Sequence, residues 1–480
     1  MDLKDRFPNE LWLEVFARLS PAARRSLSST HRLFYNLARP LGFIEFTFYS
    51  YPYGFRPAKA QLDDALERLH FWTSPRIAPH VRSCIISQKM HLWQALMPSR
   101  ADDENALMSA FFERLPHLNG LERLSVNEVR FTQAGIVNLC KLPALTHVEF
   151  LRCTVATQEP IDPSATLRVS SFTTRYDYYM NDFWIPLLSR DTLQELNLYN
   201  YLGFAKSDVQ PFPNVHTLKM DDFPLMVHDT VAIFSKFPNL YTFLSTYRGV
   251  LRGLTTVKES TIFPVLRNYT GPYQNLHIFV QRPTLTHITL DADYDGFPFS
   301  DFVTELQGIV TLPNIVSLGV RFAISAQAAF GKTEIDTLFA LFPNLVELQL
   351  TLVAMDEGDG FTPQATSFLK MFASDPLLPG TLQSLSLEWD FFSFQYASDD
   401  FPMSTDPAAP DHADILDFAV LRAELMAKCP ALTYIFLDGY HFLFLWWKTS
   451  SRSVWEASAQ TFNDADVIRA QKMKWEKSIG

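Results

Sequence analysis

The segment DADYDGFPFSDF, residues 291–302, comes nearest in this sequence to a known chemical site. Three aspartates and a glycine fit positions 1, 3, 5 and 6 of a calcium-binding EF-hand loop. These are Asp291, Asp293, Asp295 and Gly296. Position 12 of such a loop is a bidentate Glu, but here it is Phe302, and Pro298 stands at position 8. We therefore expect a polar loop leaving a strand rather than a calcium site.

Other catalytic motifs are missing from the sequence. It contains no GxxxxGK[ST], GxSxG or HExxH pattern, and its histidines are scattered. We therefore predict no catalytic residues, no metal and no cofactor. One alternative stays open, an enzyme with an unfamiliar site in the acidic, Pro-rich stretch at about 388–418. Its support is a group of aspartates: Asp399, Asp400, Asp406, Asp411 and Asp414.

Composition and charge restrict the class of protein further. At 480 residues and 47% hydrophobic, the chain can bury a large core. Its net charge of −11 argues against nucleic-acid binding, which usually needs a basic face. The four cysteines form no CxxC pair, which fits a reducing compartment. The start lacks an apolar signal region, and the longest apolar run, 442–447, is shorter than the roughly 20 residues that span a membrane. We expect a cytoplasmic or nuclear protein that binds neither nucleic acid nor membrane.

One spacing recurs along most of the chain: apolar, two residues, apolar, one residue, apolar. Most successive copies lie in or near the 20–29 residue period of leucine-rich repeats. Cys153 stands where such a repeat carries Asn or Cys. The clearest copies begin at Leu121, Leu145, Leu193, Val215, Leu285, Ile315, Leu345, Leu382 and Leu432.

Each copy predicts a short strand with a helix packed behind it. One such unit buries too little to be stable alone, so units must stack. We predict an α/β fold in which residues 41–447 form a leucine-rich-repeat solenoid (horseshoe) with a parallel sheet on its concave face. An ordinary α/β domain with parallel strands is the alternative. Residues 448–480 read as an amphipathic helix that caps the solenoid through Trp455, Phe462, Val467 and Trp475.

The outward positions of the repeat strands are candidates for contact with a partner. They carry more acidic than basic residues, a net of −4, which would favour a partner with a basic patch. These outward positions include His147, His287, Asp291, Glu388, Tyr434 and Asp438. The candidate substrate-binding residues are Arg123, Glu149, Glu195, Tyr199, Lys219, Asp221, Arg321 and Glu347.

Residues 1–40 form a different kind of unit. Pro8 suits the start of a helix, and Leu11, Val15, Phe16 and Leu19 then fall on one face at helical spacing. Ser20-Pro21 ends this helix and begins a second one. So small a piece cannot bury a sizeable core, so we expect it to dock on a partner or on the chain itself. A plain helical hairpin that caps the body is the alternative.

The segment FPNELWLEVFARLSPAARRSLSSTHRLFYNLARP, residues 7–40, resembles an F-box. That resemblance implies binding to the Skp adaptor of a cullin–RING ubiquitin ligase. The sequence departs from the family where Phe7 replaces the usual leading Leu, and where Ala23-Arg24-Arg25 replaces an acidic residue and two leucines. The implied adaptor-binding residues are Phe7, Pro8, Glu10, Leu11, Val15, Phe16, Leu19 and Leu27.

An F-box followed by leucine-rich repeats resembles the F-box/LRR proteins, especially a large group in filamentous fungi. The resemblance implies a substrate-recognition subunit of an SCF-type E3 ligase, in which the solenoid holds a target protein and the chain itself is not an enzyme. The alternative is a leucine-rich-repeat interaction scaffold that acts outside a ubiquitin ligase.

Overall fold

The structure is a computed structural model of the chain. It describes residues 9–50, 58–88, 106–155, 165–175, 181–198, 209–220, 230–245, 262–280, 282–290, 296–324, 330–354, 361–374, 378–390, 417–439, 442–448 and 454–459. The chain divides into two compact units. Unit 1 comprises Met1–Pro224 and Ala232–Pro238, and unit 2 comprises Leu225–Val231 and Asn239–Gly480.

Three helices begin unit 1 and pack on one another. They are α1 (Asn9–Arg18), α2 (Pro21–Ser28) and α3 (Arg32–Leu41). Ser20 caps α2, because its side chain accepts a hydrogen bond from the backbone N–H of Ala23. The small core between α1 and α3 is aromatic: the ring of Phe34 lies 4.6 Å from that of Trp12 and 5.7 Å from that of Phe16.

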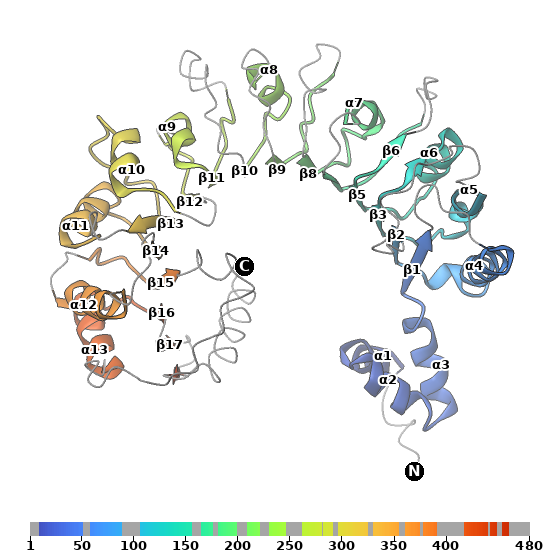
Figure 1. Ribbon diagram of the computed structural model, residues 1–480, viewed down its shortest axis with the longest axis horizontal. Coiled ribbons are helices and arrows are strands. Elements are labelled where there is room, and N and C mark those ends of the chain that lie inside the picture. Colours follow the sequence, from blue (N-terminus) through green and yellow to red (C-terminus); the bar gives the residue numbers. More distant parts are fainter. Residues whose placement is uncertain are drawn as a thin grey trace. The chain divides into compact units, whose positions relative to one another are not determined.

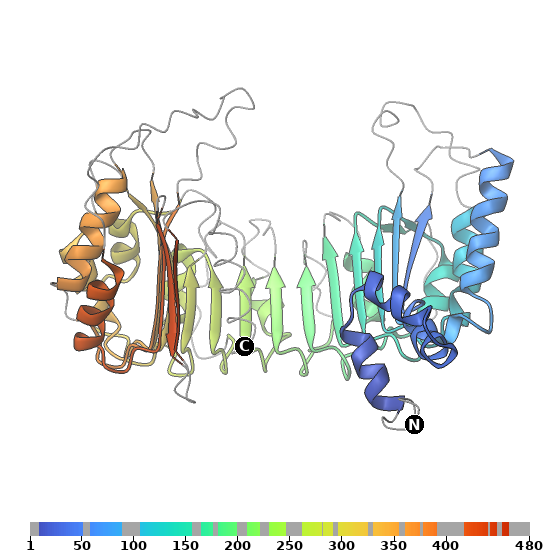
Figure 2. The same ribbon diagram turned by 90° about the horizontal axis from the view of Figure 1, so that it is seen from below.

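A parallel sheet follows in unit 1, with its strands in sequence order (Figure 1, Figure 2). Its strands coincide with the predicted repeats: Leu124 and Val126 of one copy are buried, as are Val148 and Phe150 of the next. The strands are β1 (Glu45–Ser50), β2 (Ser83–Gln88), β3 (Arg123–Asn127), β5 (His147–Leu151), β7 (Ser171–Arg175), β8 (Glu195–Leu198) and β9 (Thr217–Met220).

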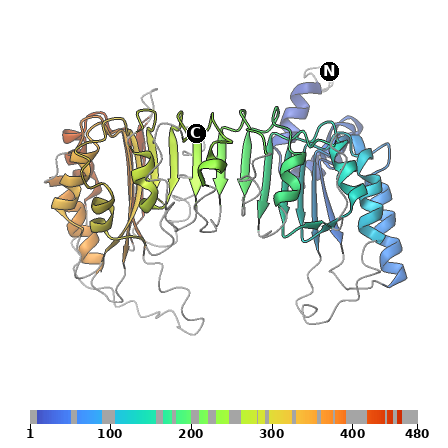
Figure 3. The same ribbon diagram turned by 90° about the horizontal axis from the view of Figure 1, so that it is seen from above.

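Helices cover one face of this sheet, as Figure 3 shows for α4, α5 and α6. Between helices and sheet lies an aromatic core in which the Trp184 ring is 4.5 Å from Phe150 and 5.2 Å from Phe131. A short second sheet pairs β4 (Arg130–Phe131) with β6 (Thr154–Val155). The helices are α4 (Lys59–Trp72), α5 (Ala106–Arg114), α6 (Gln133–Cys140) and α7 (Asn181–Trp184), and α8 (Thr230–Phe234) lies where the chain passes between the units.

Unit 2 repeats the same arrangement. Its parallel strands are β10 (Thr242–Ser245), β11 (Asn268–Gly271), β12 (His287–Leu290), β13 (Ser317–Ile324), β14 (Glu347–Ala354), β15 (Ser384–Asp390) and β16 (Tyr434–Gly439). Its helices lie on one face of the sheet (Figure 1). They are α9 (Leu276–Phe279), α10 (Phe299–Glu305), α11 (Lys332–Leu341), α12 (Phe361–Ser374) and α13 (Phe418–Lys428).

The end of unit 2 differs from the prediction. Instead of a capping helix that begins at 448, two antiparallel strands extend the sheet: β17 (Phe442–Lys448) and β18 (Val454–Ala459). The apolar run in β17 is buried on both sides, which is typical of a strand between two layers and hides the alternation expected of a half-exposed strand. The rest of the predicted cap, including Phe462, Val467 and Trp475, lies outside the described residues.

Candidate protein-interaction surfaces

The exposed side of α1 carries the strongest candidate surface in the N-terminal helices. Leu11 and Val15, one helical turn apart, are 47% and 44% exposed. Leu19, just after the end of α1, and Leu27, in α2, are half-buried. The exposed Leu13 is a further apolar side chain that sequence reasoning missed. Large apolar side chains that share a helix face and are exposed to water often mark a partner site. Leu11 and Val15, here called the α1 stripe, are therefore a candidate docking surface.

Not every predicted adaptor residue belongs to that surface. Phe16 is fully buried against Phe34, so it supports the position of α1 on α3 instead of offering a contact. Its helix face, shared with Trp12, turns toward the domain's own core. Phe7 and Pro8 lie outside the described residues, and for Glu10 the structure describes the backbone but not the side chain.

The departure from the F-box pattern at Ala23-Arg24-Arg25 has a structural role. The Nε–H of Arg24 donates a hydrogen bond to the carbonyl of Leu19, 3.1 Å away, just beyond the end of α1. Carbonyls at helix ends lack partners within the helix, and a guanidinium is a strong donor for them. Arg24 therefore ties α2 to the end of α1.

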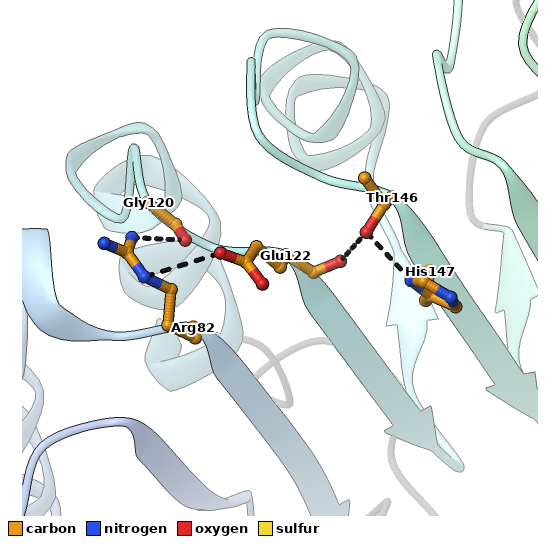
Figure 4. Close-up of polar contacts among 5 residues, drawn as sticks. All are labelled: Arg82, Gly120, Glu122, Thr146 and His147. Carbon is orange, nitrogen blue, oxygen red and sulfur yellow. Dashed lines mark hydrogen bonds and ion pairs between the residues drawn. The ribbon is translucent and has the colours of Figure 1, made fainter. Parts of the chain in front are cut away.

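Turns that enter the repeat strands hold neighbouring repeats together (Figure 4). Arg82 donates from Nη1 to the carbonyl of Gly120 at 2.8 Å and lies 3.5 Å from the carboxylate of Glu122. One repeat further on, the hydroxyl of Thr146 donates to the carbonyl of Glu122 at 3.0 Å. The same hydroxyl lies 2.8 Å from Nδ1 of His147. These contacts fix the register in which the outward side chains stand.

The sheet face opposite the helices, here called the open face, carries the predicted substrate-binding residues in both units. In unit 1, one register row contains Arg123 and Glu195, three strands apart or roughly 14 Å, both exposed. A second row contains Glu149 and Lys219, both half-buried. Tyr199 and Asp221 lie outside the described residues. The register thus places four of the predicted residues on one surface without bringing them into a cluster.

Arg175 is an open-face residue that the sequence did not reveal. It shares a register row with Asn127 and Leu151, and it belongs to a repeat whose apolar spacing is weak. With Arg175 included, the described open face of unit 1 has no acidic excess, because three basic residues (Arg123, Lys219 and Arg175) balance three acidic ones (Glu45, Glu149 and Glu195).

The acidic excess lies in unit 2. Glu347 is exposed there and Arg321 is half-buried, in different register rows. Arg321 shares its row with Glu388 and Asp438. Glu388 accepts hydrogen bonds from the Ser386 hydroxyl at 3.0 Å and from the Gln349 amide at 3.4 Å. A basic partner would therefore find its complement on the unit 2 part of the face.

The prediction that Tyr434 faces solvent was wrong. The sequence placed it among the outward, solvent-facing residues, and it does occupy an open-face position in register with Ser384. Its side chain is nevertheless buried. The neighbouring open-face residue of the same strand, Phe436, is buried too.

Part of the segment that resembles a calcium loop, residues 296–302, is described by the structure, and it contributes to the core of the repeats. Phe302 is fully buried and its ring lies 5.7 Å from that of Phe322. Gly296 has a left-handed φ of 67°, and a Cβ there would stand 2.8 Å from the backbone N of Ala323. The loop therefore needs glycine to approach β13 closely. Asp291, Asp293 and Asp295 lie outside the described residues.

Reactive groups are scarce in the part of the chain that the structure describes. There, no three His, Cys, Asp or Glu side chains are placed to hold a metal ion. Burial raises the pKa of Cys84, and it raises the pKa values of Cys140 and Cys429 to about 11, which keeps these thiols protonated at neutral pH. The aspartates of the acidic stretch, 399–414, lie outside the described residues. Within the described ranges, no helix is long and apolar enough to cross a bilayer.

Comparisons with known proteins identify the N-terminal helices. A family model for the F-box domain matches residues 5–45, a range that includes α1, α2 and α3. No curated protein matches the chain. A solved structure of a TLR13–ssRNA13 complex is similar at 15% sequence identity and a TM-score of 0.33, over 68% of this chain and 42% of that one. This chain thus covers less than half of that protein. The chain carries an F-box domain followed by leucine-rich-repeat units.

Proposed function

We propose that this chain is the substrate-recognition subunit of an SCF-type cullin–RING E3 ubiquitin ligase. The F-box domain binds the Skp adaptor, and the open face of the repeats binds a target protein. The observation that carries the proposal is the F-box match at residues 5–45, on helices that leave Leu11 and Val15 exposed.

Adaptor binding rests on the α1 stripe. Burial of two apolar side chains of this size contributes about 1.5–3 kcal/mol each when they leave water completely. Leu11, Val15 and the half-buried Leu19 form the centre of the contact. In the family resemblance Phe7, Pro8, Glu10 and Leu27 complete it.

The chain's contribution to the reaction is proximity. A target held on the repeats and a ubiquitin-conjugating enzyme held through the cullin scaffold meet at a high effective concentration, which replaces a bimolecular encounter. F-box proteins are typically adaptors without catalytic activity, and ubiquitin transfer is carried out by the partners. The protein would act in the cytoplasm or the nucleus, where those partners work.

Quantitative affinity purification of the full chain tests this assembly. We expect about one adaptor and one cullin per chain. A Leu11→Asp/Val15→Asp variant should lose both, because it places charge in an apolar contact. Val310→Asp is the matched control, since Val310 is 85% exposed and lies in unit 2. Recovery of the adaptor without cullin, or equal recovery with the α1 variant, would contradict the proposal.

One observation favours a second function, that of an interaction scaffold outside a ubiquitin ligase. Arg24 stands where the family usually carries a different residue type, and here it is engaged in holding α1 and α2 together. If the intact chain captures no adaptor, the chain is better described as a leucine-rich-repeat scaffold that acts outside a ubiquitin ligase.

A further inference from the structure

The first strand of unit 1, β1, has a free edge in the part of the chain that the structure describes. It stands at the end of the sheet and pairs there with β2 alone. The carbonyl of Ile44 accepts a hydrogen bond from the backbone N–H of Ser83 at 2.9 Å, so the backbone of Ile44 faces β2. Because backbone groups alternate between the two edges of a strand, every second residue after Ile44 also faces β2. The residues whose backbone groups point outward are therefore Glu45, Thr47 and Tyr49.

The free edge of β1 is open to a second strand. Arg68 of α4 donates from Nη2 to the carbonyl of Thr47, but at 3.4 Å this bond is long. A carbonyl oxygen has two lone pairs, so the contact leaves room for another donor. Tyr49 is 49% exposed, and Figure 2 shows the arrowed end of β1 clear of α1, α2 and α3. The outward backbone groups of β1 can therefore be reached from outside the chain.

The composition of this edge favours strand pairing. Exposed edge strands are usually protected from pairing by a lysine, a proline or a bulge, and the sequence EFTFYS of β1 contains neither Lys nor Pro. Apolar side chains border its start: Ile44 is 37% exposed, and Phe71 of α4 is 50% exposed with its ring 6.0 Å from that of Phe43. A strand laid along this edge would remove part of that apolar surface from water.

We propose that β1 pairs with β1 of a second copy of this chain, in an antiparallel arrangement centred on Thr47. In this register Thr47 opposes its own equivalent, and Glu45 opposes Tyr49 of the other copy at both ends of the junction. All the outward backbone groups of both strands then face one another and form about six N–H···O bonds. The edge thus fits a two-fold axis, the symmetry of most protein dimers.

The side chains of β1 suit this self-pairing. Glu45, Thr47 and Tyr49 all belong to the open face, since their neighbours Phe46 and Phe48 are buried on the helix side. Thr opposite Thr is a favourable cross-strand pair, and the hydroxyl of Tyr49 can donate to the carboxylate of Glu45 across the junction. No two like charges oppose each other in this register. A second copy therefore satisfies both the backbone and the side chains of the edge.

The dimer would present each functional surface twice. A two-fold axis perpendicular to the sheet keeps the two open faces on the same side, so the open faces of the two unit 1 sheets join across the junction. Helix α3 ends at Leu41 and β1 begins at Glu45, so each F-box domain stands at the start of its own β1. In an antiparallel junction the two F-box domains lie at opposite ends of the joined strands. This inference does not depend on the ligase assignment, because it concerns contacts of β1 alone.

Sedimentation equilibrium of the full chain over a concentration series tests the pairing. Because the edge is short, we expect a monomer–dimer equilibrium with a dissociation constant of about 1–100 µM. Tyr49→Glu sets two carboxylates against each other at both ends of the junction and should weaken association at least about fivefold. Glu45→Lys/Tyr49→Glu opposes unlike charges instead and should recover it. A chain that stays monomeric up to about 300 µM, or a dimer that responds to neither change, would overturn the proposal.

Two changes at Thr47 locate the junction. Thr47→Pro removes an outward N–H but none that faces β2, so it should weaken the dimer at least about tenfold while thermal unfolding stays cooperative. In the proposed register the two Thr47 Cα atoms lie about 5.5 Å apart, so mild oxidation should join two Thr47→Cys chains by a disulfide. Arg123→Cys is the control, because Arg123 is exposed on the open face of β3, and it should cross-link no more than the parent chain. Equal cross-linking of the two variants, or an undiminished Thr47→Pro dimer, would overturn the proposal.

Discussion

The thiol of Cys153 donates a hydrogen bond to the carbonyl of Val126, 3.3 Å away in the preceding repeat. The same thiol lies 3.4 Å from the carbonyl of Leu151 in its own repeat. Cys153 is buried, and the Leu151 carbonyl also accepts a hydrogen bond from the backbone N–H of Glu128 at 2.8 Å. The contact links two successive repeats at the point where their strands end.

Replacement of Cys153 tests this link. Cys153→Asn should keep a side-chain donor for the Val126 carbonyl, whereas Cys153→Ala removes the thiol that donates to it and should cost about 0.5–1.5 kcal/mol. Thermal unfolding of unit 1, followed by hydrogen exchange at β3 and β5, measures the difference. Equal protection in the two variants would show that the thiol acts only as an apolar filler.

Phe16 should matter for the fold of the F-box domain and not for its surface. Phe16→Ala leaves a cavity against Phe34 and should destabilise the three helices by about 3–5 kcal/mol. Hydrogen exchange over residues 9–41 reports this directly. Leu13→Ala is the control, because Leu13 is exposed and its loss should change stability by less than about 0.5 kcal/mol. Similar exchange in both variants would contradict the assigned role.

The buried cysteines predict an alkaline decline in stability. Burial raises the pKa of Cys429 to about 11, with the nearby Lys428 acting in the opposite direction, and the unfolded thiol titrates near 9. Between these values the unfolded chain has released a proton that the folded chain retains, so unfolding becomes easier as pH rises. The contribution is complete below pH 9 and falls from about pH 9 to about pH 11.

A Cys429→Ala variant isolates that contribution. Its unfolding temperature should fall less steeply than that of the parent chain between pH 9 and pH 10.5, although it starts lower. Urea denaturation at each pH provides a second measure of the same slope. Parallel slopes for the two chains would show that this thiol does not titrate differently in the folded state.

Charge reversal on the open face should have unequal effects in the two units. Glu347→Lys removes part of the acidic excess of unit 2, whereas Glu195→Lys alters a face in which both signs are already present. Once a target with a basic patch is identified, Glu347→Lys should slow its association and weaken the salt dependence of binding. A larger effect from Glu195→Lys would place target binding on unit 1.

Sequence patterns anticipated the repeats well, because each copy buries its apolar positions in the same way. Leu121, Leu124 and Val126 are all buried, and their equivalents in later copies follow. The expectation extended even to Cys153, whose residue type has a local role at the end of a strand. The F-box resemblance was confirmed by the family match at residues 5–45.

The spacing of apolar residues in the sequence could not show which side chains are buried by packing against another element. Helical periodicity groups Phe16 with Leu11 and Val15, but only packing on Phe34 shows which side chain faces the core. In the same way, Tyr434 occupies an outward position and is still buried. The pattern in β17 is apolar at every position from Phe442 to Trp447, and such a run fits a buried strand as well as a buried helix.

Calorimetric titration of the purified chain with purified Skp adaptor measures whether the α1 surface binds the adaptor. We expect a one-to-one complex that Leu11→Asp/Val15→Asp weakens at least about a hundredfold, since each charge enters an apolar contact at a cost of more than about 1.4 kcal/mol. Val310→Asp should bind as the parent chain does. A complex of unchanged affinity in the α1 variant, or no complex with the intact folded chain, would show that the α1 surface does not bind the adaptor.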